Sequence, residues 1–239
     1  MAKKLSLLSI LLVFVLSACS SIKNAVGGCP DAEISWVDVV MINGIKYEGE
    51  DEGLSEGEAP EKGQKIGEVK YMLADNACSN HKLKNGDAAF LPVGTEIFEI
   101  AGYRSDFRVL AGNKVYQVSE NKKAKTISEL LDIEGKVKKM SLESDYDGSH
   151  VSDFTEQETE DFMEGFLALE YAGYDKVQKK ITSDNRAFLR IHLMDGSSFN
   201  FVYWPDENVL NLGAFGTEEM KEIVTGRKGS QGDRTPGSF

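Results

Sequence analysis

The stretch AFLRIHLMDGSSFNFVYW, residues 187–204, decides the fold of the second half of the chain. It holds two segments in which every second side chain is apolar, as in strands that bury one face. The apolar sets are Leu189, Ile191 and Leu193, and Phe199, Phe201 and Tyr203. They share a face only if the connecting loop has an odd number of residues, because a shift by one residue turns every side chain over. We therefore predict a hairpin that pairs Leu193 with Phe201 through a three-residue loop at residues 196–198, or a bulged equivalent.

An amphipathic helix is predicted to precede this hairpin. Thr155 can cap the helix, and Glu158 follows at the spacing of a capping box, while Gly173 is the predicted stop. An apolar stripe at helical spacing runs along it, formed by Phe162, Met163, Phe166, Leu167 and Leu169. A strand at 136–142 and a short helix at 217–224 complete the pattern. Residues 125–225 are therefore predicted to form an α+β domain with a helix packed on an antiparallel sheet.

The first half of the chain, residues 33–124, has the pattern of a mostly antiparallel β domain. Residues 36–42 and 45–48 flank Asn43-Gly44, the strongest short signal for a two-residue hairpin. That turn pairs Ile42 with Ile45. Further short apolar runs, separated by turn dipeptides, lie at 66–73, 88–91, 96–101, 107–110 and 114–118. Closely spaced short strands of this kind favour a small barrel or sandwich.

Three polar segments are expected to lie outside regular structure. Residues 48–61 hold seven acids and no base, which predicts a mobile insert in the first hairpin. Residues 121–125, NKKAK, mark the predicted boundary between the two domains. Thr126 and Glu129 then have the spacing of a second capping box. The tail at 226–239 is predicted to be disordered.

The N-terminus has the pattern of a signal peptide. Two lysines precede the apolar run at residues 5–16, which is too short to span a bilayer that needs about 20 residues. Leu16, Ser17, Ala18 and Cys19 resemble the lipobox of bacterial lipoproteins. That resemblance implies cleavage after residue 18 and lipid attachment at Cys19. The residues after Cys19 are small, polar and glycine-bearing, which predicts a lipidated flexible stalk at residues 19–32. The alternative is an ordinary signal peptide with a chance cysteine.

The remaining cysteines, Cys29 and Cys78, are left to pair once Cys19 carries lipid. Exported compartments permit disulfides, and two thiols allow one intramolecular bridge. A bridge around a loop of about 50 residues would stabilise the protein by about 4 kcal/mol in the loop-entropy model. Two unpaired thiols, or pairing between chains, are the alternatives.

The charge balance excludes nucleic acid as a partner. The net charge is −12, and removal of residues 1–18 takes away Lys3 and Lys4 and no acid, which makes it −14. Such a surface lacks the cations that phosphates require, and it repels anionic lipids. Membrane attachment would therefore come from the acyl chains on Cys19, on the extracytoplasmic face of the cell membrane.

The usual signatures of phosphate loops, dinucleotide sites, zinc proteases, thiol redox centres and serine elbows are absent from the sequence. Three histidines limit hydrolase chemistry further, and no cofactor is expected. His192, on the strand at 187–194 and close to Asp195, is the first candidate for a base, although a sheet-surface histidine is the simpler interpretation. His81 is expected to be exposed to solvent.

Two other groups of residues are candidate sites. The spacing of Asp145, Asp147, Ser149, Asp153 and Glu156 fits positions 1, 3, 5, 9 and 12 of a calcium loop. His150 stands where that loop needs glycine, and a polar loop before a helix cap is the simpler interpretation. Tyr203, Trp204 and Phe215 could line a groove for a sugar or peptide, or fill the core and rim of the second domain.

Residues 83–109 resemble a segment of uncharacterised lipoproteins of Bacillus-type bacteria, and this resemblance implies no activity. Together these features favour a lipid-anchored, non-catalytic protein whose two domains bind a small ligand or an envelope protein. An envelope hydrolase that uses acidic residues and His192 is the alternative. A regulator that sequesters another envelope protein through its acidic surface is a third hypothesis, and its binding should weaken with salt.

Overall fold

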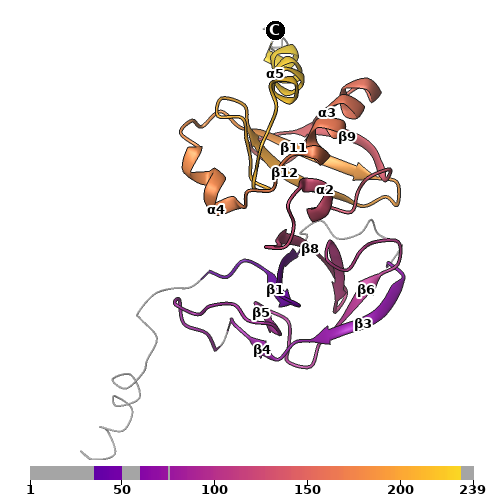
Figure 1. Cartoon of the computed structure of the whole chain (residues 1–239), viewed down its shortest axis with the longest axis vertical. Coiled ribbons are helices and arrows are strands. Elements are labelled where there is room, and N and C mark those ends of the chain that lie inside the picture. Colours follow the sequence, from indigo (N-terminus) through magenta and orange to yellow (C-terminus); the bar gives the residue numbers. More distant parts are fainter. Residues whose placement is uncertain (1–34, 50–59, 75, 233–239) are drawn as a thin grey trace, which may run out of the picture.

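The computed structural model of the protein describes residues 35–49, 60–74 and 76–232. These residues form two mostly antiparallel sheets with few helices, which confirms the predicted α+β class. The first half of the chain carries an eight-stranded sheet and the second half a six-stranded sheet, stacked end to end in Figure 1. The predicted signal peptide, Cys19, the stalk and most of the acidic insert lie outside the described residues.

The eight-stranded sheet has the order β3-β6-β7-β8-β2-β1-β5-β4 and curls on itself (Figure 1). Adjacent strands in this sheet are antiparallel, except for the short parallel pair β4 and β5. The run predicted at 66–73 divides between β3 and β4. The strands are β1 (Val39–Ile42), β2 (Ile45–Gly49), β3 (Lys62–Glu68), β4 (Tyr71–Met72), β5 (Asp87–Ala88), β6 (Glu96–Ile100), β7 (Arg108–Ala111) and β8 (Lys114–Glu120).

The predicted hairpin at Asn43-Gly44 is confirmed in its register. Ile42 pairs with Ile45, and Val40 with Tyr47. Asn43 and Gly44 have φ angles of 53° and 80°, the left-handed values that a two-residue hairpin turn of this type requires at both positions. The four paired residues are buried, so the turn sets which face of β1 and β2 enters the core.

The six-stranded sheet has the order β10-β9-β11-β12-β13-β14. Its strands are β9 (Val137–Glu143), β10 (His150–Asp153), β11 (Ala187–Leu193), β12 (Ser198–Trp204), β13 (Val209–Leu210) and β14 (Ala214–Phe215). The helices of this half are α2 (Ile127–Leu130), α3 (Glu156–Ala168), α4 (Tyr174–Val177), a 3₁₀ turn at Gln178–Lys180, and α5 (Glu218–Gly232). The sequence did not predict β10, and α5 continues through residues 226–232, where the sequence predicts disorder. Residues 233–239 lie outside the described part of the chain.

The β11–β12 hairpin confirms the shared apolar face but corrects the predicted loop. Leu189 pairs with Phe201 and Ile191 with Phe199, so the three-residue loop is 194–196 and not 196–198. Gly196 has a φ of +86°. A three-residue hairpin loop needs this left-handed residue at its end, whereas the predicted loop placed the glycine first. Asp195 fixes the turn by accepting hydrogen bonds from the backbone nitrogen and hydroxyl of Ser197.

Helix α3 packs its predicted stripe on this apolar face. Thr155 caps the helix, and a complete capping box joins it to Glu158. Phe166 is fully buried, with its ring centre 5.7 Å from that of Phe162 and 5.4 Å from that of Phe201 on β12. The helix ends at Ala168, earlier than predicted, and Gly173 instead precedes α4 with a φ of +86°.

The hydrophobic core is continuous across the two sheets. At the junction, the rings of Phe107 and Phe199 meet edge to face with centres 6.4 Å apart. The buried guanidinium of Arg108 lies 4.9 Å from the centre of the Phe107 ring, and it donates to Gln117 Oε1 at 2.9 Å and to Ser197 Oγ at 2.7 Å. A cation from the first half thus binds residues of both halves.

Polar contacts at the rim of the junction complete the connection. Tyr103 donates its hydroxyl to Asp195 at 2.6 Å, and burial together with this bond raises the pKa of Tyr103 to about 12. Lys136 donates to the carbonyl of Gly102, and the backbone nitrogen of Arg104 donates to Asp132. These contacts from several elements hold the two sheets in one arrangement.

Cys78 follows β4, and its predicted partner, Cys29, lies outside the described residues. The Cys29–Cys78 pairing therefore remains a prediction. We expect protein purified from membranes to show no reactive thiol when it is denatured without reductant, and two after reduction, because lipid blocks Cys19. A thiol assay on both samples measures this, and two thiols in the unreduced sample would contradict the bridge.

Candidate ligand-binding cleft

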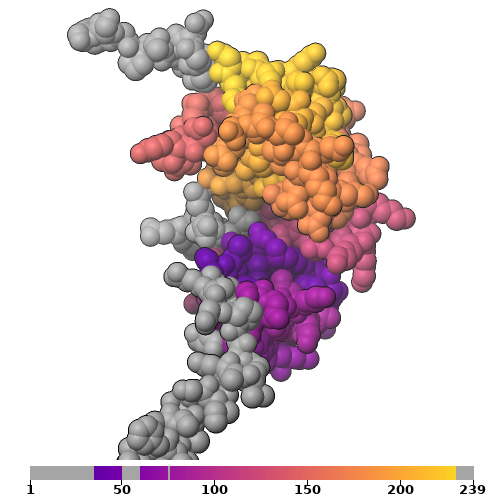
Figure 2. All heavy atoms as spheres, turned by 90° about the vertical axis from the view of Figure 1, so that its left-hand side faces the viewer, coloured from indigo at the N-terminus to yellow at the C-terminus, as the bar shows by residue number. Residues whose placement is uncertain are grey.

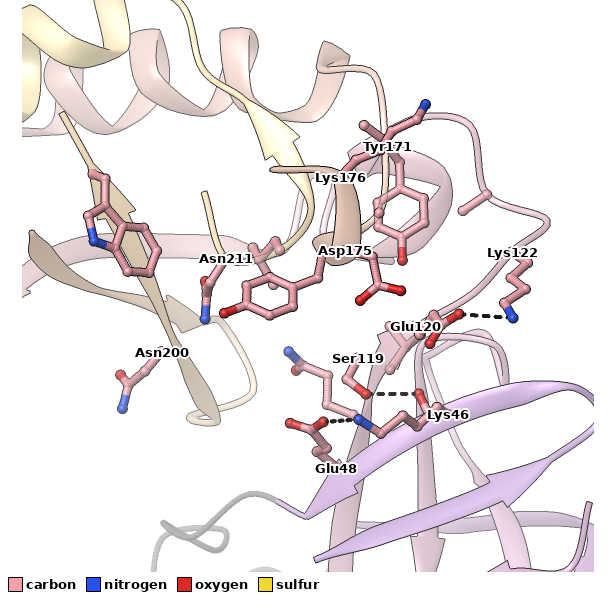
Figure 3. Close-up of a pocket in the computed structure, with 18 residues that line it drawn as sticks. Lys46, Glu48, Ser119, Glu120, Lys122, Tyr171, Asp175, Lys176, Asn200 and Asn211 are labelled. Atoms are coloured by element: carbon pink, nitrogen blue, oxygen red, sulfur yellow. Dashed lines mark hydrogen bonds and ion pairs between the residues drawn. The ribbon is translucent and has the colours of Figure 1, made fainter. Parts of the chain in front are cut away.

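A cleft of about 710 Å³ opens between the two sheets, where β2 and β8 face β12 and the loop before α4 (Figure 3). In Figure 2 the orange segments of the second half lie directly above the indigo strands of the first. The cleft is lined by Lys46, Glu48, Gln117, Val118, Ser119, Glu120, Lys122, Ala124, Tyr171, Ala172, Gly173, Tyr174, Asp175, Lys176, Asn200, Trp204, Asn211 and Leu212.

One wall of the cleft comes from β12 and the segment after β13. Asn200 and Trp204 lie on the same face of β12, since side chains of a strand alternate and the residues between them at odd positions are buried. Asn211 accepts a hydrogen bond from the backbone nitrogen of Val202 through its Oδ1, at 2.8 Å. Its amide nitrogen is left to face the cleft, and Figure 3 shows the side chains of Asn200 and Asn211 along this wall.

A second wall is formed by the loop that carries Tyr171 and by the first two residues of α4, Tyr174 and Asp175. Backbone bonds hold this loop, because the nitrogens of Ala172 and Gly173 both donate to the carbonyl of Gly213. Tyr171 and Asp175 point toward the first half of the chain in Figure 3. Burial raises the pKa of Tyr171, and the nearby acid Glu120 adds to the rise.

Gly213 is the residue that lets this loop seat closely. Its φ is +89°, and a Cβ at this position would lie 2.9 Å from backbone atoms of Gly173 and from the ring of Tyr171. The backbone atoms of Gly173 cannot move aside to make room for this Cβ, as the end of a flexible side chain could. The loop wall of the cleft therefore depends on a glycine here.

Replacing Gly213 with alanine should lower the free energy of unfolding by about 1–2 kcal/mol for the left-handed backbone, and further for the displaced loop. Gly135 provides the matched control, because its φ is +69° with nothing within 4 Å of the added Cβ. Urea unfolding of G213A and G135A measures the difference. Equal losses in the two variants would contradict the close seating of the loop.

The floor of the cleft, on β2, β8 and the residues that follow β8, carries charged and polar side chains with partners close by. Lys46 pairs with Glu48 at 2.7 Å, and Lys122 with Glu120 at 3.4 Å (Figure 3). Gln117 is bound to the buried Arg108 through its Oε1. The floor is thus joined to the junction between the sheets.

A separate polar cluster surrounds His192, on the face of the six-stranded sheet opposite α3. His192 Nε2 lies 2.8 Å from Ser141 Oγ, and Ser141 Oγ lies 2.5 Å from Glu143 Oε1. Arg190 Nε lies 3.5 Å from the same carboxylate oxygen. Serine, histidine and glutamate are thus in contact, although the sequence singled out His192 with Asp195, which instead binds Tyr103 and Ser197.

This cluster is not arranged as a catalytic triad. The single proton of the Ser141 hydroxyl is donated to Glu143, so the Nε2 of His192 must carry the proton in the other hydrogen bond. His192 therefore cannot take the serine proton, and the acid touches the serine where a triad needs it on the histidine. Ser141 is also fully buried. The cluster ties β9 to β11.

Stability should decrease in mild acid because of His192. Burial lowers its pKa, and the charges of Lys139 and Arg190 add to the effect, while Glu143 and Asp153 oppose it. A lowered folded pKa means that the unfolded chain takes up the proton first, so stability is lost as the pH falls below about 6.5. Urea unfolding at pH 7.5 and 5.5 should show a smaller loss for H192Q than for the wild type.

An unchanged pH dependence in H192Q would contradict the role assigned to His192.

The five residues of the predicted calcium loop are not brought around one point. They lie across the β9–β10 turn, β10 and the start of α3, where Asp147 accepts from Ser149 and Asp153 pairs with Lys139. Within residues 35–49, 60–74 and 76–232, no group of three or more His, Cys, Asp or Glu side chains could hold a metal ion. The geometry gives the calcium hypothesis no support.

Of the three aromatic residues predicted to line a groove, only Trp204 lines the cleft. Trp204 lines the cleft, whereas Tyr203 is buried and donates to Asn208, and Phe215 is exposed on β14. His81 is not the solvent-exposed side chain that was expected, because it binds Asp87 at 2.7 Å and stacks on Tyr71. No local motif connects four further residues of the cleft, so the sequence did not predict them: Tyr171, Tyr174, Asn200 and Asn211.

Comparisons with protein-family models, with curated proteins and with solved structures found no match to this chain. The geometry of the cleft is therefore the basis for assigning a function.

Proposed function

We propose that the protein is a non-catalytic binding protein that holds a small ligand in the cleft between its two sheets. The observation that carries this proposal is the lining of the cleft, which combines three aromatic rings with side-chain amides. Clefts of roughly 300–1,000 Å³ at the junction of two structural units are the usual place for small-molecule sites. The volume of about 710 Å³ falls within that range.

The rigid junction supports this proposal. Arg108, Tyr103 and Lys136 each form a hydrogen bond between the two halves of the chain. These bonds lie near the Phe107 and Phe199 rings at the junction. The walls of the cleft are thus set before a ligand arrives. A preformed site binds more tightly because less order has to be imposed on binding.

Binding is favoured over hydrolysis because the one serine–histidine contact described above has no reachable nucleophile. Ser141 is fully buried, and its hydroxyl already donates to Glu143. His192 lies outside the residues that line the cleft.

Trp204 provides a direct test of the site. Trp36 and Trp204 are the two tryptophans of the chain, and Trp36 packs in a separate cluster with Val39 and Leu73. In the W36F variant, Trp204 is the sole tryptophan, so a ligand in the cleft should change its fluorescence in a saturable way and raise the Tm. W204F, which keeps Trp36, is the matched control and should lose the signal.

A screen of neutral sugars, amino acids, nucleotides and short peptides provides the ligands for this test. A compound that raises the Tm but leaves the emission of Trp204 unchanged would place the site elsewhere. A screen in which no class of compound has an effect would also contradict the proposal.

We further propose that the protein is lipid-anchored through Cys19 on the extracytoplasmic face of the cell membrane. The lipobox-like sequence at residues 16–19 supports this, and Cys19 lies outside the described residues. Among the described residues, no helix is long and apolar enough to cross a membrane. C19S should lose incorporation of labelled palmitate and leave the membrane fraction, while C78S should retain both. Label retained in C19S would overturn the assignment.

A further inference from the structure

We infer that the ligand of the cleft is an uncharged saccharide. This inference rests on the proposed function and adds the chemical class of the ligand.

The charged side chains of the lining balance each other. The lining holds three lysines and three acids in a chain whose net charge is −12. Lys46 is paired with Glu48 and Lys122 with Glu120, so only Lys176 and Asp175 are outside these two ion pairs. An anionic ligand would need several cations that are not already neutralised, and no arginine is among the lining residues. A cationic ligand would find one acid, Asp175, outside these ion pairs. The lining therefore favours a ligand without charge.

The aromatic rings favour a ligand with apolar faces. Trp204 and Tyr171 are half-buried at the cleft, and Tyr174 is 46 % exposed. Covering partly exposed rings with a flat apolar surface removes that surface from water, which lowers the free energy of the complex. The C–H face of a pyranose ring is such a surface, and its hydroxyl groups remain at the edge.

The polar groups of the cleft match that hydroxyl edge. A sugar hydroxyl both donates and accepts, and so does a side-chain amide. The backbone of Asn200 is paired with Arg190 in the sheet, whereas its side-chain amide makes no hydrogen bond to another described residue and is available to a ligand. The nitrogen of Asn211 faces the cleft because its oxygen is bound to Val202. Asp175 adds a carboxylate that can accept a charge-assisted bond from a hydroxyl.

The test is a fluorescence and calorimetric titration of the W36F variant with uncharged oligosaccharides of one to four rings. The panel contains gluco-, galacto-, manno- and N-acetylated series. Glucuronate, trialanine and AMP serve as the charged, peptide and nucleotide comparisons. At least one neutral sugar series should bind and shift the emission of Trp204.

Variants in this background then locate the sugar. N200A should weaken binding about 5- to 10-fold through one lost polar contact. Y174A should weaken it about 10-fold or more through the lost ring. N113A removes an exposed asparagine that does not line the cleft, so it should leave the affinity unchanged.

The outcomes separate this inference from the proposed function. If trialanine or AMP binds at Trp204 with sensitivity to N200A, and no neutral sugar does, the saccharide assignment is overturned and the cleft stands as a binding site. If a sugar binds with equal affinity to N200A, Y174A and N113A, the saccharide assignment for this cleft is also overturned. If no class binds, both proposals are overturned.

Discussion

Phe166→Ala should lower the free energy of unfolding by about 3–5 kcal/mol, the range for truncating a buried phenylalanine. The side chain is fully buried, and its ring lies against Phe162 on the same helix and Phe201 on β12. Removing the ring leaves a cavity between α3 and the six-stranded sheet that neighbours on both sides cannot fill. Urea unfolding followed by circular dichroism measures the change.

Tyr146→Ala is the control for this experiment. Tyr146 is also aromatic, but it is 93 % exposed in the turn between β9 and β10, so its removal should change stability by less than about 0.5 kcal/mol. Phe166→Leu should fall between the two, since leucine retains part of the buried volume. A loss below about 1 kcal/mol for Phe166→Ala would contradict the packing of α3 on the sheet.

Arg108→Ala should have the second-largest effect, a loss of about 3 kcal/mol. The side chain is buried at the junction, where it binds Gln117 and Ser197 and lies over the rings of Phe107 and Phe199. Truncation removes this packing, leaves the buried Gln117 Oε1 without its donor, and removes the hydrogen bond to the half-buried Ser197. Because the contacts cross between the sheets, the cleft should also lose its fixed shape, and ligand affinity should fall with stability.

Two variants separate the contributions of Arg108. Arg108→Met retains much of the apolar volume and should recover part of the lost stability, while the hydrogen bonds to Gln117 and Ser197 remain missing. Arg186→Ala removes an exposed arginine whose guanidinium lies over the ring of Phe188, and it should have little effect. If Arg108→Ala and Arg186→Ala unfold at the same urea concentration, the junction does not depend on Arg108.

Local signals in the sequence were sufficient for the elements with strong turn and capping chemistry. Asn43-Gly44 predicted its hairpin to the residue pair, because few dipeptides accept left-handed values at both positions. Thr155 and Glu158 predicted the start of α3 in the same way. Alternation in β11 and β12 predicted the shared face, but the pairing was wrong by four residues along one strand, a shift that leaves the faces unchanged.

Features that depend on contacts between distant residues could not be predicted. Strand β10 pairs with β9 through a polar segment whose acids resembled a metal loop instead. Helix α5 extends past Gly226 even though its residues are polar and rich in glycine. The residues that line the cleft are far apart in the sequence, from Lys46 on β2 to Asn211 after β13. No spacing along the sequence therefore identifies the cleft.

This separation of the lining residues has a consequence for folding. Contacts between residues so far apart form only after most of the chain has been ordered, and they make folding slow. The cleft is therefore present only in the completed molecule, and halves cut at residues 121–125 would each carry an incomplete set of walls. A ligand at 100 times its Kd would stabilise the whole chain by about 2.7 kcal/mol, and it would protect both sheets together from proteolysis.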